Sequence, residues 1–276
     1  MRSPSRAAGR IIELDYPVFP RKRELRRSIS GFKIEQLINA ELDVARKLMS
    51  RVMLFPWLTE ISLEEPSDPR EPFWLNGWLP PLDALSLCAL LIQQNPTVYV
   101  EVGSGNSTKF ARCVIDRCRL QTRIVSVDPE PRTEIDTICD TVIRERLEEM
   151  DMQIFSHLQP NDIVFMDNSH QSFMNTDVTV CFLEIIPALR SGVVYGFHDI
   201  FLPDDYPETW TNRFYNEQYL LAAYLLGGGN GDKILFPSWY LSQSPQFSDT
   251  LHKMHEELQI EESLLKNGAC FWLRRA

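Results

Sequence analysis

The stretch Val98-Tyr99-Val100-Glu101-Val102-Gly103-Ser104-Gly105 decides the fold of this 276-residue chain. Its first half is a short run of β-branched and aromatic residues, which predicts a buried β-strand. The two glycines that follow predict a sharp turn, because glycine lets the backbone bend and lets a ligand approach without a Cβ in the way. A helix is expected from about residue 107. The pattern is therefore a strand, a glycine turn and a helix.

A second apolar run, residues 124–127, ends in Asp128. An acidic residue at the tip of a second strand can hold the two hydroxyls of a ribose, so the pattern indicates a nucleoside pocket. A dinucleotide site would want Gly or Ala three residues after the second glycine, where this chain has Thr108. Glu101 would also repel a pyrophosphate. It suits a cationic ligand such as S-adenosylmethionine, which carries an ammonium and a sulfonium and no phosphate.

This acidic-x-Gly-x-Gly pattern, with an acid after the second strand, resembles the first two motifs of class I S-adenosylmethionine-dependent methyltransferases. Five stretches look like a bacterial group of predicted small-molecule methyltransferases without assigned substrates: Val-Gly-Ser-Gly-Asn-Ser-Thr, Asp-Pro-Glu-Pro-Arg, Asp-Asn-Ser-His, His-Asp-Ile-Phe-Leu-Pro and Tyr-Asn-Glu-Gln-Tyr. The resemblance covers roughly residues 72–274 and implies the fold and the cofactor, but no acceptor. The expected cofactor-binding residues are Glu101, Gly103, Ser104, Gly105, Asn106, Asp128 and Asp167.

The rest of the chain alternates between predicted strands and helices. The expected strands are 97–102, 123–128, 141–146, 162–167, 193–199, 233–241 and 269–274. The expected helices are 82–94, 107–119, 133–139, 150–158, 177–189, 212–226 and 248–266. Such alternation predicts the α/β class, with a Rossmann-like doubly wound sheet of seven strands that is mostly parallel. The resemblance implies that the last strand is antiparallel.

The N-terminal part is expected to form a helical and irregular extension. Residues 1–30 are polar and basic and are predicted to be a poorly ordered, solvated arm. Residues 34–52 have the apolar spacing of a helix. Residues 56–81 are rich in Pro and Trp, which predicts an irregular segment that covers the core edge or forms a lid. The predicted division is therefore an arm, helix and lid segment over residues 1–78 and a class I methyltransferase domain over residues 79–276.

Polar residues follow two of the predicted strands, and they should converge because ligands bind beyond the carboxyl ends of parallel strands. The first group is Asp167-Asn168-Ser169-His170 and the second is His198-Asp199. His198 is the first predicted catalytic base and His170 the second, because an imidazole can take the proton from a substrate hydroxyl. Asp199 is also a predicted catalytic residue, because it could deprotonate or bind that hydroxyl. The alternative is that either histidine only hydrogen-bonds the loop backbone. The candidate acceptor contacts are Tyr206, Arg213 and Glu217.

Asp167 and Asp199 occupy the positions at which several small-molecule O-methyltransferases, which the chain resembles, bind Mg²⁺. A hard cation takes oxygen ligands and can lower the pKa of a bound hydroxyl. The chain departs from the catechol-type pattern, which has Asp-Asn where this sequence has His198-Asp199. Metal-assisted catalysis and metal-free general-base catalysis therefore both stay open.

The composition argues against several classes of protein. A net charge of −10 argues against nucleic-acid binding, which wants a basic face. No stretch approaches the ~20 apolar residues of a membrane span, and no secretion signal is recognised. The six cysteines are scattered without zinc spacing and are expected to be reduced, which predicts a cytoplasmic protein. The sequence leaves open whether the chain forms a homo-oligomer.

The predicted function is methyl transfer from S-adenosylmethionine to a small-molecule acceptor, with a hydroxyl oxygen as the expected acceptor atom. Two alternatives stay open. One is an NAD-dependent oxidoreductase, against which Thr108 and Glu101 count. The other is a non-catalytic nucleoside-binding protein of the same fold, which would bind the cofactor without turnover.

Overall fold

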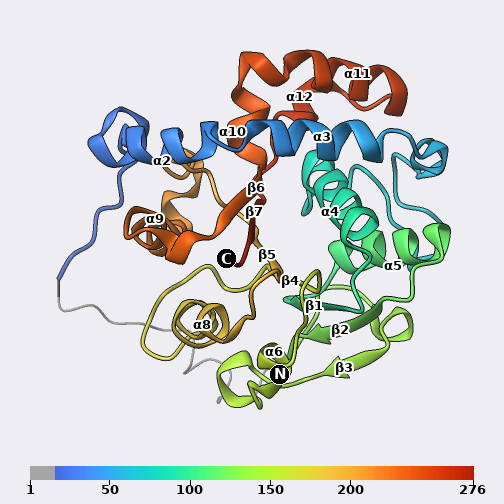
Figure 1. Ribbon diagram of the computed structural model, residues 1–276, viewed down its shortest axis with the longest axis horizontal. Coiled ribbons are helices and arrows are strands. Elements are labelled where there is room, and N and C mark those ends of the chain that lie inside the picture. Colours follow the sequence, from blue (N-terminus) through green and yellow to red (C-terminus); the bar gives the residue numbers. More distant parts are fainter. Residues whose placement is uncertain (1–15) are drawn as a thin grey trace.

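The computed structural model describes residues 16–276 as a twisted sheet with helices on both faces (Figure 1). The sheet has seven strands in the order β3-β2-β1-β4-β5-β7-β6. Their bounds are β1 Val98–Val102, β2 Arg123–Val127, β3 Thr141–Ile143, β4 Ile163–Met166, β5 Val194–Phe197, β6 Lys233–Pro237 and β7 Phe271–Arg274. The strands β1 to β5 pair in parallel, and β7 runs antiparallel to β5 and β6. The predicted Rossmann-like sheet with an antiparallel last strand is confirmed.

The register of the strands brings their carboxyl ends to one edge of the sheet. Val102 at the end of β1 pairs with Val127 of β2 and with Met166 of β4. Met166 in turn pairs with Phe197 at the end of β5. The residues that leave the sheet at this edge are therefore Gly103, Asp128, Asp167 and His198. This edge is where a ligand is expected in a doubly wound sheet.

The central strands are buried because helices cover both faces of the sheet. The helices α4, Pro81–Gln94, and α5, Asn106–Cys118, lie on one side, and α8, Ile186–Ala188, and α9, Glu217–Leu226, lie on the other (Figure 1). The junction of β5 and β7 is tightly packed. The Trp272 ring stacks on Phe165 at a centroid distance of 4.9 Å, and a Cβ at Gly196 would lie 2.2 Å from that indole. Glycine on β5 therefore makes room for the tryptophan.

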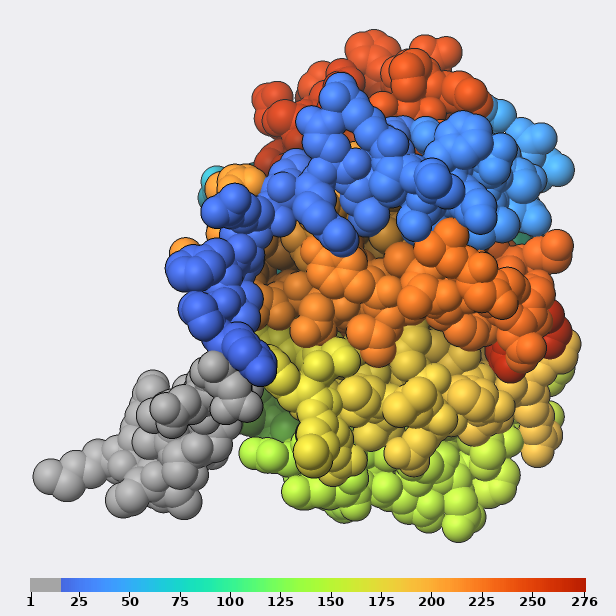
Figure 2. Space-filling view, turned by 90° about the vertical axis from the view of Figure 1, so that its left-hand side faces the viewer, coloured from blue at the N-terminus to red at the C-terminus, as the bar shows by residue number. Residues whose placement is uncertain are grey.

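Two helices precede the sheet. The helices α2, Ile29–Asn39, and α3, Leu42–Val52, lie across one end of the molecule, where α2 contacts α9 and α3 contacts α4 (Figure 1). The segment before α2, in blue, runs along the face beside the orange α9 (Figure 2).

Side chains tie this segment to the body of the molecule. The backbone N–H of Arg23 donates to the carboxylate of Asp205 at 2.7 Å, and Arg26 pairs with Glu35 at 2.8 Å. The predicted poorly ordered arm is therefore wrong from Arg23 onward, because these contacts hold the chain. The part of that prediction on residues 1–15 lies outside the described residues. The division at residue 78 stays a prediction.

Two predicted elements near the C-terminus are wrong in their extent. The strand predicted over 233–241 ends at Pro237, because the N–H of Ser238 donates to the carbonyl of Cys270 and the chain then turns into α10, Ser238–Gln243. The helix predicted over 248–266 is two helices, α11, Ser248–Leu258, and α12, Glu262–Leu265. Gln259 separates them because its φ of +57° is left-handed and ends α11.

Three predicted helices around β3, β4 and β5 also differ in detail. The helix expected at 150–158 is a single turn, α6, Gln153–Ser156, and that expected at 133–139 is a 3₁₀ turn, Asp136–Ile138. The helix predicted over 177–189 consists of α7, Asp177–Val180, a π-helical turn and α8. Within residues 16–276, no helix combines the length and the apolar character that crossing a membrane would require.

Candidate active site

The two glycines of the turn after β1 have different roles. Gly103 has a φ of +80°, and a Cβ there would lie 1.8 Å from the carbonyl oxygen of Asp167. Gly103 is therefore required by the close approach of the β4 loop. At Gly105 a Cβ would meet only the methyl group of Thr133, at 3.9 Å. Because the fold leaves this space open, a side chain at Gly105 would extend toward the cavity rather than into the core.

Glu101 lies beneath this turn and does not reach the cavity. Its carboxylate accepts a hydrogen bond from the Tyr99 hydroxyl at 2.7 Å and another from the Thr108 hydroxyl. Thr108 in turn accepts the N–H of Gly105 at 3.0 Å, so the acid and the threonine hold the turn together. Burial raises the pKa of Glu101 to about 7, against the hydrogen bonds from Ser107, Thr108 and Tyr99, which lower it. The sequence predicts a direct contact between Glu101 and a cationic ligand. In the structure this side chain is fully buried beneath the turn.

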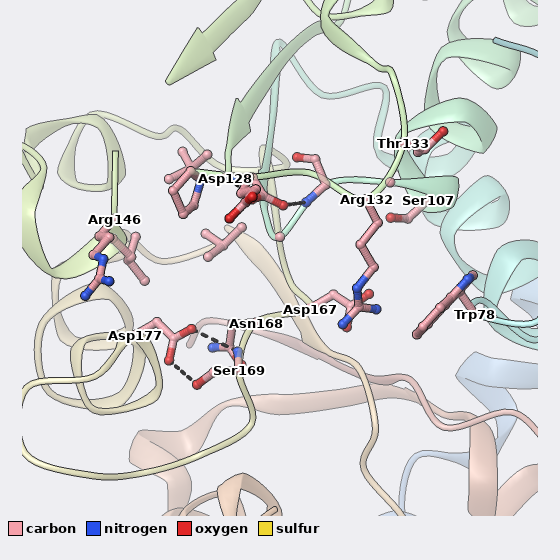
Figure 3. Close-up of a pocket in the computed structure, with 18 of the residues that line it drawn as sticks. Trp78, Ser107, Asp128, Arg132, Thr133, Arg146, Asp167, Asn168, Ser169 and Asp177 are labelled. Carbon is pink, nitrogen blue, oxygen red and sulfur yellow. Dashed lines mark hydrogen bonds between the residues drawn. The ribbon is translucent and has the colours of Figure 1, made fainter. Parts of the chain in front are cut away.

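Asp128 connects the second strand to the same turn. One carboxylate oxygen accepts the N–H of Ser104 at 2.9 Å, and the other accepts the N–H of Glu130 at 2.8 Å. Each oxygen keeps a further lone pair, so the carboxylate can still accept hydrogen bonds from a ligand. Asp128 faces a cavity of about 450 Å³ next to the glycine turn (Figure 3).

This cavity is lined by five segments at the edge of the sheet: residues 78–79, 102–107, 127–133, 146–148 and 167–177. Its wall includes most of the predicted cofactor residues: Gly103, Ser104, Gly105, Asn106, Asp128 and Asp167. Trp78 and Arg132 lie together at one side, with the guanidinium 4.2 Å from the indole centroid (Figure 3). Asn168, Ser169 and Asp177 lie at another side, where Asp177 accepts both the N–H and the hydroxyl of Ser169 (Figure 3).

Two imidazoles and two carboxylates lie close together next to the cavity. They are called here the His–Asp cluster: Asp167, His170, His198 and Asp199. His170 Nε2 is 3.3 Å from Asp167 and 3.4 Å from Asp199. His198 Nδ1 is 3.4 Å from both carboxylates. Of the four residues, Asp167 lines the cavity. The loop after β4 and the loop after β5 thus bring the predicted catalytic residues together, with Asp167 between them and the cavity.

Two residues of this cluster have a left-handed backbone conformation. His170 and Asp199 have φ values of +58° and +57°, a region that non-glycine residues adopt at an energetic cost. Strain of this kind, where the surroundings impose it, is concentrated at functional sites.

Two carboxylates outside the cluster face the outer nitrogens of the imidazoles. Glu217 at the start of α9 lies 2.8 Å from His170 Nδ1, and Asp83 in α4 lies 3.4 Å from His198 Nε2. Asp83 is itself fixed, because its two oxygens accept the N–H groups of Ala269 and Cys270 at 2.7 and 2.8 Å. The sequence analysis missed Asp83, which nothing distinguishes from an ordinary helix residue.

The electrostatics of the cluster favour charged side chains. Burial alone would lower the pKa of His198, but the Asp167 and Asp199 carboxylates outweigh it, so the pKa lies well above its usual value. For His170, burial is outweighed in the same way by Asp167 and Glu217. Burial would raise the pKa of Asp167, but His198 and His170 lower it below its usual range. Both shifts favour the protonated imidazole over the neutral one, which is unfavourable for the predicted role of His198 as a free base.

A family comparison identifies the segment that carries this site. Residues 100–200 match the family described as a methyltransferase domain. This segment is similar to a methyltransferase domain. It runs from β1 through the end of β5 and so includes the glycine turn, Asp128 and the His–Asp cluster. The predicted resemblance to methyltransferases is confirmed over this segment.

Solved structures similar to the chain are methyltransferases and a synthase at low sequence identity. The SAH-bound Podospora anserina methyltransferase PaMTH1 is 11% identical over 70% of this chain and 77% of its own, with a TM-score of 0.40. The plantazolicin methyltransferase BpumL, in complex with a monoazolic desmethylPZN analog and SAH, is 12% identical over 90% and 99%, with a TM-score of 0.44. The mycolic acid cyclopropane synthase CmaA1 is 12% identical over 87% and 96%, with a TM-score of 0.32. Among curated proteins, none matches the sequence.

The three predicted acceptor contacts follow the matched segment in the sequence and lie in different surroundings. Glu217 is fully buried and bonded to His170, so it supports the cluster and is not exposed to an acceptor. Tyr206 is buried in an aromatic group, and the Arg213 guanidinium stacks over Trp210 at 3.8 Å. Tyr215 of the same group lies 4.7 Å from the His170 ring, which sequence reasoning did not single out.

Proposed function

We propose that the protein transfers a methyl group from S-adenosylmethionine to a hydroxyl oxygen of a small molecule. The observation that carries the proposal is the cavity itself, since the glycine turn, Asp128 and Asp167 all line the same space. This arrangement offers a nucleoside site and an oxygen-rich acceptor site within one space.

The cofactor is proposed to lie along the glycine turn. The ribose hydroxyls would donate to Asp128, whose carboxylate already faces the cavity. The methionine carboxylate would lie at the N-terminus of α5, where Asn106 and Ser107 line the cavity and the helix dipole favours an anion. The space beside Gly105 lets the cofactor approach the backbone.

The reaction is proposed to be an in-line displacement at the methyl carbon. The acceptor oxygen forms the new O–C bond as the S–C bond breaks, and its electron pair stays on sulfur to give S-adenosylhomocysteine. The hydroxyl proton passes to Asp167, the cluster member that lines the cavity. A carboxylate of low pKa can serve here because the methylated oxygen is a far stronger acid than a carboxylic acid. Alignment supplies the larger part of the rate, and His170 and His198 hold Asp167 in position.

Magnesium, which the resemblance implies, does not fit the donors of this site. Mg²⁺ demands near-octahedral oxygen ligands and retains waters. Here Asp167 and Asp199 are each faced by two imidazole nitrogens at 3.3–3.4 Å. The proposed reaction therefore contains no step through Mg²⁺.

The test is an assay of S-adenosylhomocysteine formation with a panel of phenols, sugars and hydroxy acids, followed by mass spectrometry of the products. The expected result is acceptor-dependent turnover with an O-methyl product. The Asp167→Asn variant should lower kcat at least about 100-fold with cofactor affinity retained, and the exposed control Asp151→Asn should not. A product methylated on nitrogen or carbon would contradict the acceptor assignment. Cofactor binding without turnover across the panel would favour the non-catalytic alternative.

A further inference from the structure

Arg132 is a cationic residue of the cavity wall that stacks on an aromatic ring. Its guanidinium lies 4.2 Å from the indole centroid of Trp78. Although the chain has 38 acidic residues, no ion pair with Arg132 forms within residues 16–276. Stacking occupies one face of a guanidinium and leaves the N–H donors at its edge available. Arg132 therefore offers a charged donor group to a ligand in the cavity.

Trp78 is held in place by the segment before α4. Asn76 Oδ1 accepts the N–H groups of Trp78 and Leu79 at 3.0 and 2.8 Å, and its amide nitrogen donates to the Phe73 carbonyl at 2.9 Å. Asn76 and Leu79 are buried, whereas Trp78 is 59% exposed. The segment predicted as a core cover or a lid thus places an aromatic ring on a fixed backbone at the edge of the cavity.

The loop after β2 brings Arg132 to the same side of the cavity. This loop, residues 128–133, contains two prolines, which restrict its φ angles. Figure 3 shows the Arg132 side chain extending from the loop toward Trp78. The next residue, Thr133, carries the methyl group that a Cβ at Gly105 would meet at 3.9 Å. Arg132 therefore lies beside the space in which the cofactor is proposed to bind.

The charges around the cavity favour a ligand group with a single negative charge. Two arginines line the cavity, and one of them, Arg146, lies 3.8 Å from Glu148. Five acidic side chains also line it: Asp128, Glu130, Glu148, Asp167 and Asp177. These acids repel a doubly charged phosphate more strongly than a carboxylate. A carboxylate also fits the edge of a guanidinium through two parallel N–H···O bonds.

We propose that Arg132, supported by Trp78, binds a carboxylate of the methyl acceptor, so that the substrate is a small hydroxy acid. This inference rests on the proposed function, because the acceptor hydroxyl is assigned to Asp167 in the same cavity. Arg132 binds and orients the substrate and takes no part in the proton transfer. Its removal therefore affects KM more than kcat.

The methionine carboxylate of the cofactor is a different partner for Arg132. The N-terminus of α5, with Asn106 and Ser107 at the cavity, already offers a site for that group. The two assignments differ in a measurable way. Arg132→Gln should leave the affinity for S-adenosylhomocysteine within about fivefold of wild type. A loss of at least about 20-fold, with the affinity for methylthioadenosine unchanged, would assign Arg132 to the cofactor and overturn the proposal.

The test is saturation-transfer NMR on the full-length protein saturated with S-adenosylhomocysteine. The probes are salicylate, mandelate, gallate and lactate, each compared with its neutral amide, and glycerol phosphate. At least one acid should bind about 20-fold or more tightly than its amide, because a hydrogen bond between charged groups is lost in the amide. The proposal is overturned if no acid binds, if acids and amides bind equally, or if glycerol phosphate binds more tightly than the acids.

Variants assign the preference for the acid to one residue. Arg132→Gln should remove it, with the affinity for the amide unchanged, and Arg132→Lys should retain part of it because lysine keeps the charge without the planar fork. Trp78→Ala should weaken acid binding about threefold. The matched control is Arg123→Gln, an exposed arginine at the other end of β2, which should bind the acid as wild type does. An acid preference that persists in Arg132→Gln would contradict the assignment.

Turnover assays with the same acids and amides separate this inference from the proposed function. For an acid that is methylated, Arg132→Gln should raise KM at least about 20-fold and change kcat less than about threefold. Methylation of neutral acceptors alone supports the proposed function and overturns the carboxylate site. Acid binding that depends on Arg132, without methylation of any acceptor, supports the carboxylate site and contradicts the proposed function.

Discussion

The cavity wall around the glycine turn and the His–Asp cluster, of which Asp167 lines the cavity, are built in different ways. The wall around the glycine turn consists of backbone groups and small polar side chains from β1, α5 and the β2 loop, which are close in sequence apart from Asp128. The His–Asp cluster consists of charged side chains from two loops, held from behind by Asp83 in α4 and Glu217 in α9. The glycine turn is a local structure, whereas the cluster depends on four separate parts of the chain.

This difference explains what each region can tolerate. At the glycine turn, steric fit decides whether a substitution is tolerated, because a Cβ either clashes with its neighbours or has space. In the cluster, the balance of charge decides, because removing one partner leaves a buried charge or a buried donor without compensation. Substitutions should therefore act through steric clashes at the glycine turn and through lost hydrogen-bond or charge partners in the cluster.

The largest expected effect is at Gly103. Gly103→Ala places a Cβ 1.8 Å from the carbonyl oxygen of Asp167 and forces a left-handed φ on alanine. We expect a loss of about 3–5 kcal/mol in the free energy of unfolding, measured by chemical denaturation. Gly105→Ala is the control, since its Cβ has space, and it should cost less than about 1 kcal/mol. Equal losses in the two variants would show that the turn is not packed as described.

Sequence reasoning predicted the glycine wall better than the cluster. Asp128 and the two glycines were found because adjacent strands in a parallel sheet place consecutive motifs at one edge. The burial of Glu101 beneath the turn could not be predicted, because the pattern gives its distance along the chain but not the side of the strand it faces. That side is set by the Tyr99 and Thr108 hydroxyls, which bond it beneath the turn.

The cluster was predicted only in part. His170, His198, Asp167 and Asp199 follow predicted strands and were therefore grouped correctly at one edge. Asp83 could not be predicted, because it lies more than a hundred residues before His198 in the sequence. The pattern of its helix is that of an ordinary buried helix. Long-range contacts of this kind depend on how α4 packs on β7, which no local pattern specifies.

The next effect tests the anchor of the cluster. Asp83→Ala removes the acceptor of the Ala269 and Cys270 N–H groups and leaves His198 without its outer carboxylate. We expect a loss of about 2–4 kcal/mol in stability, measured by urea unfolding, because two buried donors lose their partner. Asp116→Ala, at an exposed position of α5, is the control and should change stability by less than about 0.5 kcal/mol. A loss as small in Asp83→Ala would mean that Asp83 does not anchor β7.

A pH-dependent effect tests the environment of Glu101, which lies beneath the glycine turn. The carboxyl of Glu101 titrates near 4.5 when unfolded and at about 7 when buried, so the folded state holds more protons between those values. The stability of the wild type should therefore fall by roughly 3 kcal/mol as pH rises through that window and stay level above it. Glu101→Gln lacks this titration, so its stability relative to wild type should rise between pH 5 and pH 8. Parallel profiles for the two proteins would contradict the raised pKa.

The smallest expected effect is at the side of the cavity where Trp78 meets Arg132. Trp78→Ala removes a half-exposed indole that stacks with the guanidinium at 4.2 Å. We expect a loss of about 0.5–1 kcal/mol in the binding free energy of S-adenosylhomocysteine, measured by calorimetry, with stability nearly unchanged. Phe214→Ala, an exposed aromatic residue that does not line the cavity, should leave affinity at the wild-type value. An unaltered affinity in Trp78→Ala would remove Trp78 from the binding site.

The central claim is that the space beside Gly105 holds the cofactor, and calorimetric titration with S-adenosylhomocysteine tests it most directly. Wild type should bind one equivalent with micromolar affinity, and Gly105→Val should lose binding at least about 100-fold while its melting temperature stays within a few degrees. Equal affinity in the two proteins, or no saturable binding to the wild type, would contradict the claim.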